Sequence, residues 1–356
     1  DVYKRQPTER VLAAEGGDAL RLVQALSHRY DAVLMNPPFG EPIPDTKPYL
    51  KAAYPWIPTK DHNLLAAFVG RGLELCNASG YLGAITSRAG MFLTTFERWR
   101  KEVLLGNDLT VLADLGHKVM HEALVEAAAY VVRPGRSRHE HPATFIRLLR
   151  EPPDRRPAAL REVCRHLRAG SPDGRVFHVT PGAFDAVPGA PMAYWMSPAI
   201  RRLFTDYPSL EGHGADVRQG LATGEDFRFV RAFWEVDPAR IARSRDETFA
   251  GKRWVPFAKG GEYSPFWADI HLVVDYESDG EQLRGFPGAR PQNLQYYFRP
   301  GLTWPPRTNA GLGMRVLPAG CAFAHKGCGV FAVGDPLAVL GWLRSRFAQA
   351  LIDLMV

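Results

Sequence analysis

The 356-residue chain is 46% hydrophobic and 11% aromatic, which is typical of a globular protein and excludes a wholly disordered one. Its length is too great for one ordinary core and predicts two domains. The net charge is +6, and no apolar run approaches the roughly 20 residues of a membrane helix. The four cysteines are too few and too scattered for a disulfide framework, which favours a reducing compartment.

The two ends of the chain do not look like the ends of a protein. The first six residues, Asp1-Val2-Tyr3-Lys4-Arg5-Gln6, resemble a translated sequencing-library end, so we leave them out of the fold. The last three, Leu354-Met355-Val356, stop inside an apolar helical pattern that has no C-cap glycine. We therefore expect an internal fragment of a longer protein.

From Val11 to about Arg150 the pattern alternates between strand and helix, which predicts a mainly parallel sheet with helices on both faces. The last two apolar runs have no helix between them, so we expect them to form an antiparallel hairpin. The expected strands are Asp31 to Met35, Tyr81 to Thr86, Leu109 to Leu115, Leu124 to Val132 and Ala143 to Leu149, and the expected helices are Asn63 to Asn77 and Thr94 to Leu105.

Asn36-Pro37-Pro38-Phe39 follows the first expected strand, and open α/β sheets bind their ligands at strand ends. The Asn36 side-chain oxygen and the Pro37 carbonyl are two acceptors that can hold both hydrogens of an aromatic amine. Because proline fixes φ, the direction of its carbonyl is set. Holding both hydrogens localises the nitrogen lone pair and favours methyl transfer, while Phe39 offers a flat face to a base removed from its stack.

A long insert follows between Asn36 and Asp61 and contains five prolines after the tetrapeptide. Loops of this length beside an active site usually work as a lid or a clamp. An ordinary surface loop is the alternative interpretation.

Arginine is concentrated between Val131 and Thr180, where eleven arginines face five acids and account for the whole net charge. Such an excess suits a surface that contacts phosphates. The same segment is rich in proline, so a solvated linker is an equal alternative.

Beyond Met196 the chain mixes basic and aromatic residues, which suits phosphate contact and base stacking, although burial is more common for any single aromatic residue. Lys259 and Gly260 are contact candidates because glycine lets a backbone approach a ligand. Arg290, Gln292 and Asn293 have side chains suited to reading base edges. The chain closes with an amphipathic helix expected from Pro336 to Val356.

Cys321, His325 and Cys328 are close in the sequence, but a fourth ligand and a paired knuckle are lacking. We expect structural cysteines and no metal.

Several segments resemble the amino-group DNA methyltransferases, class I enzymes that use S-adenosylmethionine. Asn36-Pro37-Pro38-Phe39 is similar to their motif IV, and Gly17-Asp18-Ala19-Leu20 to the preceding motif. The resemblance implies that Asp18, Asn36 and Phe68 contact the cofactor. It also implies that the segment from Phe92 to Arg100 closes the base pocket, with Phe96, or alternatively Phe92, stacking on the base opposite Phe39.

The second half resembles the target-recognition region of PglX, the adenine-specific methyltransferase of BREX phage-defence systems. The segments that carry this likeness are Gly220 to Gly224, Trp254 to Tyr263 and Arg290 to Asn293. It implies methylation of adenine N6 in double-stranded DNA, in phage defence or restriction-modification. It also implies a bacterial cytoplasmic protein, other BREX proteins as candidate partners, and DNA contact by Lys259, Gly260, Arg290, Gln292 and Asn293.

The expected fold is therefore a partial Rossmann-like methyltransferase sheet followed by a mixed α/β target-recognition domain. We assign residues 7–150 to the catalytic part, 151–195 to a basic linker and 196–356 to DNA recognition, with residues 1–6 set aside. The glycine-rich cofactor loop is expected upstream of the chain. A permuted order, with that loop beyond residue 356, is the alternative that Gly17-Asp18 disfavours.

The sequence allows two other functions. Asn-Pro-Pro-aromatic also occurs in enzymes that methylate a protein glutamine, but those lack a large domain after the catalytic one. A scaffold that binds DNA without modifying it is the other alternative, and the intact Asn36 and Phe39 disfavour it.

Overall fold

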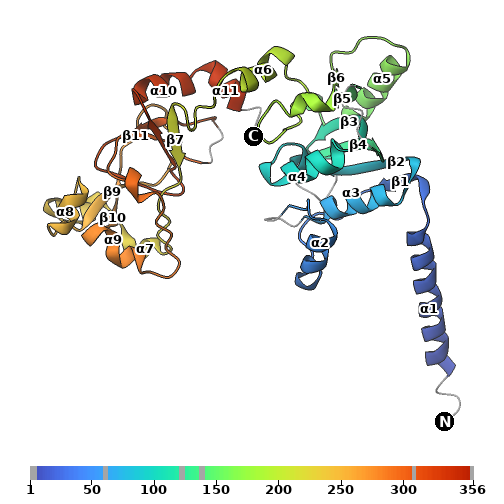
Figure 1. The fold of residues 1–356 in the computed structure, drawn as a ribbon, viewed down its shortest axis with the longest axis horizontal. Coiled ribbons are helices and arrows are strands. Elements are labelled where there is room, and N and C mark those ends of the chain that lie inside the picture. The colour runs from blue at the N-terminus through green and yellow to red at the C-terminus, as the bar shows by residue number, and fades with distance from the viewer. Residues whose placement is uncertain (1–5, 59–62, 120–124, 136–140, 307–309, 353–356) are drawn as a thin grey trace. The chain divides into compact units, whose positions relative to one another are not determined.

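The structure is a computed structural model that describes residues 6–58, 63–119, 125–135, 141–306 and 310–352. It is a mixed α/β fold with three sheets (Figure 1). The chain divides into two compact units, the first reaching Asp206 and the second beginning at Tyr207. Each unit encloses its own hydrophobic clusters. The predictions for residues 1–5 and 353–356 fall outside the described residues.

The first unit is built on a six-stranded sheet in the order β1-β2-β4-β3-β5-β6 (Figure 1). β1 pairs in parallel with β2, and β3 with β5, whereas β4 is antiparallel to both of its neighbours and β6 is antiparallel to β5. β1, β2, β3 and β5 therefore run in one direction. The strands are β1 (Tyr30–Met35), β2 (Cys76–Ser87), β3 (Asp108–Gly116), β4 (Ala127–Arg133), β5 (Ala143–Arg147) and β6 (Val176–Val179).

All five strands expected from the sequence are present, but their order differs from the predicted hairpin. β4 and β5 are not neighbours, because β4 inserts between β2 and β3 and pairs with both. The short connection between β4 and β5 does not force them to pair, since β4 gains two partners in the middle of the sheet. The sheet is consequently mixed rather than mainly parallel.

Helices cover both faces of this sheet, as predicted, with α3 on one face and α5 on the other (Figure 1). Asn63 caps α3, because its side-chain oxygen accepts the Leu65 N–H at 3.2 Å. The apolar stripe of α3, which includes Leu65, Val69 and Leu73, is buried against the sheet. The helices are α1 (Gln6–Ser27), α2 (Lys47–Ala53), α3 (Leu64–Glu74), α4 (Glu97–Trp99), α5 (Arg156–Arg168) and α6 (Pro198–Asp206), and a π-helical stretch, Arg100–Leu104, extends α4.

The proline-rich insert after Asn36 is partly folded onto the core. It contains α2, and beyond it Tyr54 and Ile57 are buried in the same cluster as α3. Residues 59–62 of the insert lie outside the described residues. The described part is therefore anchored to the unit rather than being a plain surface loop.

The structure places residues 151–195 inside the first unit, where a linker was predicted. α5 buries Ala159 and Val163 against the sheet, and β6 adds a strand to its edge. Two arginines of the arginine-rich stretch between Val131 and Thr180 bind protein groups: Arg175 pairs with Asp173 at 2.7 Å, and Arg147, in β5, lies over the Trp195 ring at 4.4 Å. Part of the arginine excess therefore stabilises the unit itself.

The second unit contains two four-stranded sheets, ordered β13-β9-β10-β8 and β12-β11-β14-β7. The second of these sheets is antiparallel throughout. The strands are β7 (Ala215–Arg218), β8 (Val230–Ala232), β9 (Trp254–Ala258), β10 (Leu272–Asp275), β11 (Gly301–Thr303), β12 (Arg315–Leu317), β13 (Ala322–Phe323) and β14 (Gly329–Ala332). The helices are α7 (Asp226–Phe229), α8 (Arg245–Phe249), α9 (Glu277–Arg284), α10 (Pro336–Leu343) and α11 (Arg346–Ile352).

The closing helix expected from Pro336 is broken into α10 and α11. α10 ends at Leu343, and the Ser345 hydroxyl then accepts the Ala348 N–H at 3.1 Å, which starts a new helix. A serine that caps a helix in this way competes with continuation of the preceding one. Among the described residues, no helix is long and apolar enough to cross a bilayer.

Candidate functional site

The Asn36 turn begins where β1 ends, at Met35. The Asn36 side chain is exposed, Pro37 is buried, and Phe39 is half-buried against the cluster under α3. The Gly40 carbonyl accepts the Leu64 N–H at 2.9 Å, so the end of the turn is tied to the start of α3. Local packing thus fixes the turn and leaves the Asn36 carboxamide accessible.

Asn36 also lines an open apolar groove of about 580 Å³ on the sheet face that carries α5. Leu34, on the edge strand β1, is 83% exposed there. The other side chains around it are mostly aliphatic and come from β2, β3, β4, β5 and α5: Ile85, Val111, Ala113, Ala129, Val131, Ile146, Leu160 and Cys164. Asn36 is the polar side chain at the strand-end side of this groove.

The three residues expected to contact S-adenosylmethionine do not converge. Asp18 lies within α1 rather than in a turn, is exposed, and pairs with Arg21 at 3.6 Å. Phe68 is 44% exposed on α3, and of the three only Asn36 lines the groove. These three residues therefore do not assemble a site for this cofactor.

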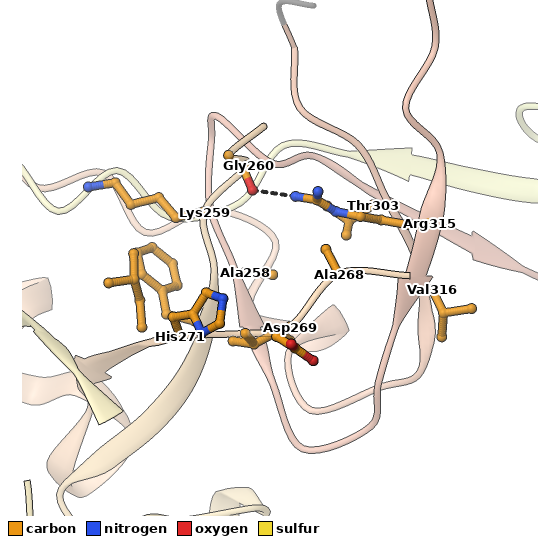
Figure 2. A pocket seen from close by; sticks show the side chains of 13 residues that line it. Ala258, Lys259, Gly260, Ala268, Asp269, His271, Thr303, Arg315 and Val316 are labelled. Atoms are coloured by element: carbon orange, nitrogen blue, oxygen red, sulfur yellow. Dashed lines mark hydrogen bonds between the residues drawn. The ribbon is translucent and has the colours of Figure 1, made fainter. Parts of the chain in front are cut away.

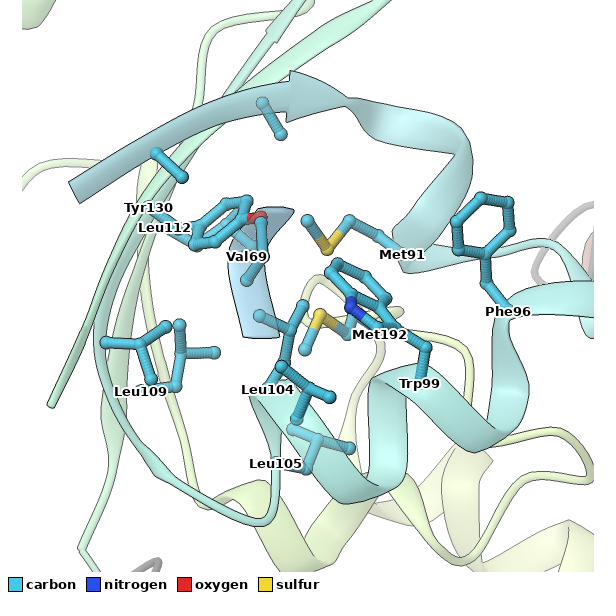
Figure 3. Close-up of a cluster of buried hydrophobic side chains, with 14 of the residues drawn as sticks. Val69, Met91, Phe96, Trp99, Leu104, Leu105, Leu109, Leu112, Tyr130 and Met192 are labelled. Atoms are coloured by element: carbon cyan, nitrogen blue, oxygen red, sulfur yellow. The ribbon is translucent and has the colours of Figure 1, made fainter. Parts of the chain in front are cut away.

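The aromatic residues expected on the far side of the base are buried in the protein core. Phe96 is 2% exposed and packs edge-to-face on Trp99, with ring centroids 5.7 Å apart (Figure 3). Phe92 is 7% exposed and lies between the Arg88 guanidinium and the Trp195 ring. Neither ring presents a free face for stacking, since hydrophobic burial holds both. Of the two base-stacking residues, only Phe39 stays beside the Asn36 turn.

In the second unit, Arg290 and Gln292 line one open pocket of about 440 Å³. The backbones of Arg290 and Ala222 form a short bridge that brings the two walls together. Gly224, at φ +75°, makes this approach possible, because a side chain there would lie 2.7 Å from the Gly288 carbonyl carbon. The remaining lining residues are Gln219, Thr223, Asp226, Gly288 and His325.

Lys259 connects this pocket with a second, smaller one. Its ammonium pairs with Asp226, while Lys259 and Gly260 also line a cavity of about 190 Å³ with Asp269, His271 and Arg315 (Figure 2). Gly260 adopts φ +82°, and its carbonyl accepts a hydrogen bond from the buried Arg315 guanidinium. The backbone of the segment that was predicted to approach DNA is thus hydrogen-bonded, at Gly260, to a buried arginine of the same unit.

Asn293, the last predicted DNA contact, binds the protein itself. It adopts the left-handed conformation at φ 55°, and its side-chain amide donates to the Gln219 carbonyl at 2.9 Å. Its role here is to fix the wall that carries Gln292. The structure therefore gathers four of the five predicted residues around the two pockets and assigns Asn293 to their support.

Sequence reasoning missed Asp226, which is central to this arrangement. Burial opposes ionisation of Asp226, but hydrogen bonds from Lys259 and Thr223 lower the pKa of its carboxyl below the usual range. The Thr223 hydroxyl donates to it at 2.5 Å. The sequence signal for this contact is a threonine three residues before an aspartate. That spacing is too common in proteins to single out Thr223 and Asp226.

Cys321 and Cys328, with His325 between them, lie in the second unit. Cys321 is buried in the core of the second unit, and burial raises the pKa of its thiol to about 11. Within the described ranges, no three His, Cys, Asp or Glu side chains are grouped as metal ligands would be.

The strand that ends in the accessible Asn-Pro-Pro-Phe turn lies in the part of the chain that matches a known family. Residues 6–120, about a third of the chain, match the family described as the Eco57I restriction-modification methylase. The matched residues include the Asn36 turn and the strands β1 and β2.

The chain is similar to adenine-specific methyltransferases of the BrxX and PglX type along more than nine tenths of its length. It is 28% identical to BrxX of Escherichia coli O9:H4 (strain HS) over 331 residues, which cover 91% of this chain and 26% of that protein. It is 25% identical to PglX of Lacticaseibacillus casei (strain Zhang) over 352 residues, or 94% and 29% of the two chains. The chain thus spans about a quarter of the length of these relatives, and the predicted resemblance is confirmed.

A solved structure with a related fold is that of the type IIL restriction-modification enzyme MmeI in complex with DNA. The TM-score is 0.50 at 12% identity, over 88% of this chain and 42% of that one. At this identity the comparison supports the mixed α/β fold of the chain.

Proposed function

We propose that the chain is part of a DNA methyltransferase that modifies the N6 amine of an adenine flipped out of double-stranded DNA. The observation that carries the proposal is the Asn36 turn, where an exposed carboxamide follows a strand end and the next residue, Pro37, is buried and rigid. The relatives named as adenine-specific methyltransferases support the same chemistry.

The residues of this chain contribute acceptors and a flat face. The Asn36 oxygen and the Pro37 carbonyl accept the two amine hydrogens, which localises the lone pair on nitrogen. Phe39 then supports the base beside them. S-adenosylmethionine is the expected methyl donor in the Rossmann-like part of the complete protein, in line with the family.

The second unit favours DNA over a protein glutamine as the substrate. Arg290 and Gln292 face one pocket, and guanidinium and carboxamide groups are the side chains that read guanine and adenine edges. We also propose that the complete protein acts in a BREX or restriction-modification system and has other BREX proteins as partners.

The test is Asn36→Ala in the complete protein, followed by transfer of labelled methyl groups to DNA. We expect methylation to fall by about 100-fold or more, which is typical of losing one directed hydrogen bond at a reacting group, and DNA affinity to stay within a factor of about 3. Asn36→Asp retains an acceptor oxygen and is expected to keep more activity.

Asn77→Ala is the matched control, because Asn77 donates to Asp31 at 2.6 Å on an exposed part of the same sheet. Equal loss of methylation in both variants would contradict the role of Asn36. Full DNA binding without methylation in the unmodified protein would favour the scaffold instead.

A further inference from the structure

Phe227 is the most exposed large hydrophobic side chain in the part of the chain that the structure describes, at 94% of its full accessible surface. It lies in α7, directly after Asp226, which lines the pocket of Arg290 and Gln292. A phenylalanine side chain that stays in water lacks the stabilisation of about 1.5–3 kcal/mol that its burial would contribute. Its position directly after a residue of a polar pocket makes the ring available to a ligand bound there.

The turn that presents Phe227 is held on both sides. Before it, Asp226 accepts from Thr223 and pairs with Lys259. The Phe227 carbonyl itself accepts from the Arg231 guanidinium at 2.6 Å. Two residues later, Phe229 is 1% exposed and sits in the core. Phe227 cannot turn inward without breaking these contacts, so its exposure is built into the fold.

The surroundings of Phe227 are predominantly basic. Arg228 lies over the Phe229 and Phe286 rings at 5.2 and 4.9 Å, and Lys326 is close enough to act on the Asp226 carboxyl. Glu225 is the acid next to Asp226 in the sequence, while the charge of Asp226 is balanced by Lys259. A rigid aromatic ring amid cations suits a polyanion with flat, stackable groups rather than an apolar protein surface.

We propose that Phe227 is a wedge that inserts into the base stack of duplex DNA beside the bases read by the Arg290 and Gln292 pocket. Apolar side chains inserted between base steps unstack them and unwind or kink the duplex. The wedge rests on the proposed function only in taking DNA as the ligand, and it requires no methyl transfer.

The test compares the unmodified chain with Phe227→Ala and Phe227→Trp, using closed circular plasmid DNA. Phe227→Ala is expected to weaken binding by about 5- to 150-fold, the range of one stacked base. It should also abolish the change in linking number that remains after topoisomerase relaxation in the presence of the protein. Phe227→Trp keeps a flat ring and is expected to retain both effects.

Phe249→Ala is the matched control, because Phe249 is 63% exposed in α8 of the same unit, whereas Phe227 directly follows the pocket residue Asp226. Unchanged binding and linking number in Phe227→Ala would overturn the proposal, and so would equal losses in Phe249→Ala. Neither readout uses methylation, so the two proposals can fail separately. If Phe227→Ala loses both effects while Asn36→Ala still methylates DNA, only the proposed function is overturned.

Discussion

Asp114 is a buried carboxylate that links three segments of the first unit. It is 1% exposed, accepts from Arg88 Nε at 2.9 Å and from the Tyr194 hydroxyl at 2.8 Å. Burial raises the pKa of Asp114, although both partners oppose that rise. The three residues join the end of β2, the end of β3 and the segment before α6. A buried pair of this kind specifies the arrangement of its elements more than it adds net stability.

Asp114→Ala is therefore expected to lower the free energy of unfolding of the first unit by about 3–5 kcal/mol, because the half-buried Arg88 keeps only the more exposed Glu126 and the buried Tyr194 hydroxyl loses its acceptor. Tyr194→Phe should cost about 1–2 kcal/mol, since only one hydrogen bond is lost. Urea unfolding measures both values. Glu126→Gln is the control, as this more exposed partner of Arg88 should contribute less than about 1 kcal/mol. A loss for Asp114→Ala no larger than that control would show that the pair is dispensable.

At the scale of elements, α5 and β6 are joined by the carboxylate of Asp173. It accepts from the Arg175 backbone N–H at 2.9 Å, from the Arg175 guanidinium at 2.7 Å and from His166 at 2.8 Å. The hydrogen bonds from Arg175 hold the pKa of Asp173 well below its usual range, against the opposing effect of burial. Because the folded state lowers this pKa, the contribution to stability is complete above about pH 4 and is lost as the pH falls through the folded value.

We expect Asp173→Asn to lower the free energy of unfolding of the first unit by about 1.5–3 kcal/mol at pH 7, as is typical of hydrogen bonds to a charged group. The difference from the unmodified chain should narrow as the pH falls below about 4, because the Asp173 carboxylate of the unfolded chain then takes up a proton while that of the folded chain stays ionised. Urea unfolding at pH 7, 5 and 3 measures it. Asp154→Asn, at an exposed position, should have little effect at any of these pH values. A difference that is constant with pH would rule out the ionised Asp173 as its source.

The elements that the sequence predicted well are those set by local patterns. The apolar runs of β1 and β3 and the Asn63 cap of α3 are readable within a few residues. The position of β4 in the sheet cannot be read from a few residues, because it depends on pairing with strands about 20 and 45 residues away. The same limit applies to the pocket in the second unit, where Asp226 meets Lys259 only after the fold has formed.

Phe96 shows a different kind of failure. The helical spacing of Phe96, Trp99 and Val103 already predicts one buried stripe, and all three are in the core. Motif resemblance assigned Phe96 to the base pocket and outweighed that pattern. Asn36 differs because its polar side chain is exposed, so its packing does not contradict the role that the motif predicts for it.

At the scale of the whole molecule, the two units are expected to unfold separately, because each has its own core. Leu82, in β2, is fully buried in the first unit, and Leu283, in α9, is fully buried in the second. Leu82→Ala and Leu283→Ala remove the same atoms and leave a cavity of the same chemical kind. Each should cost about 2–5 kcal/mol in its own unit.

Scanning calorimetry of the chain should then show two transitions, with each variant lowering the midpoint of a different one. The double variant should lower both by the same amounts as the single variants, since the two leucines share no partner and their effects are expected to add. A single transition that both variants shift would mean that the units fold as one. Separate transitions would mean that a weakened first unit can leave the second unit folded, so that the methylation and the DNA binding proposed for the two units would be separable by mutation.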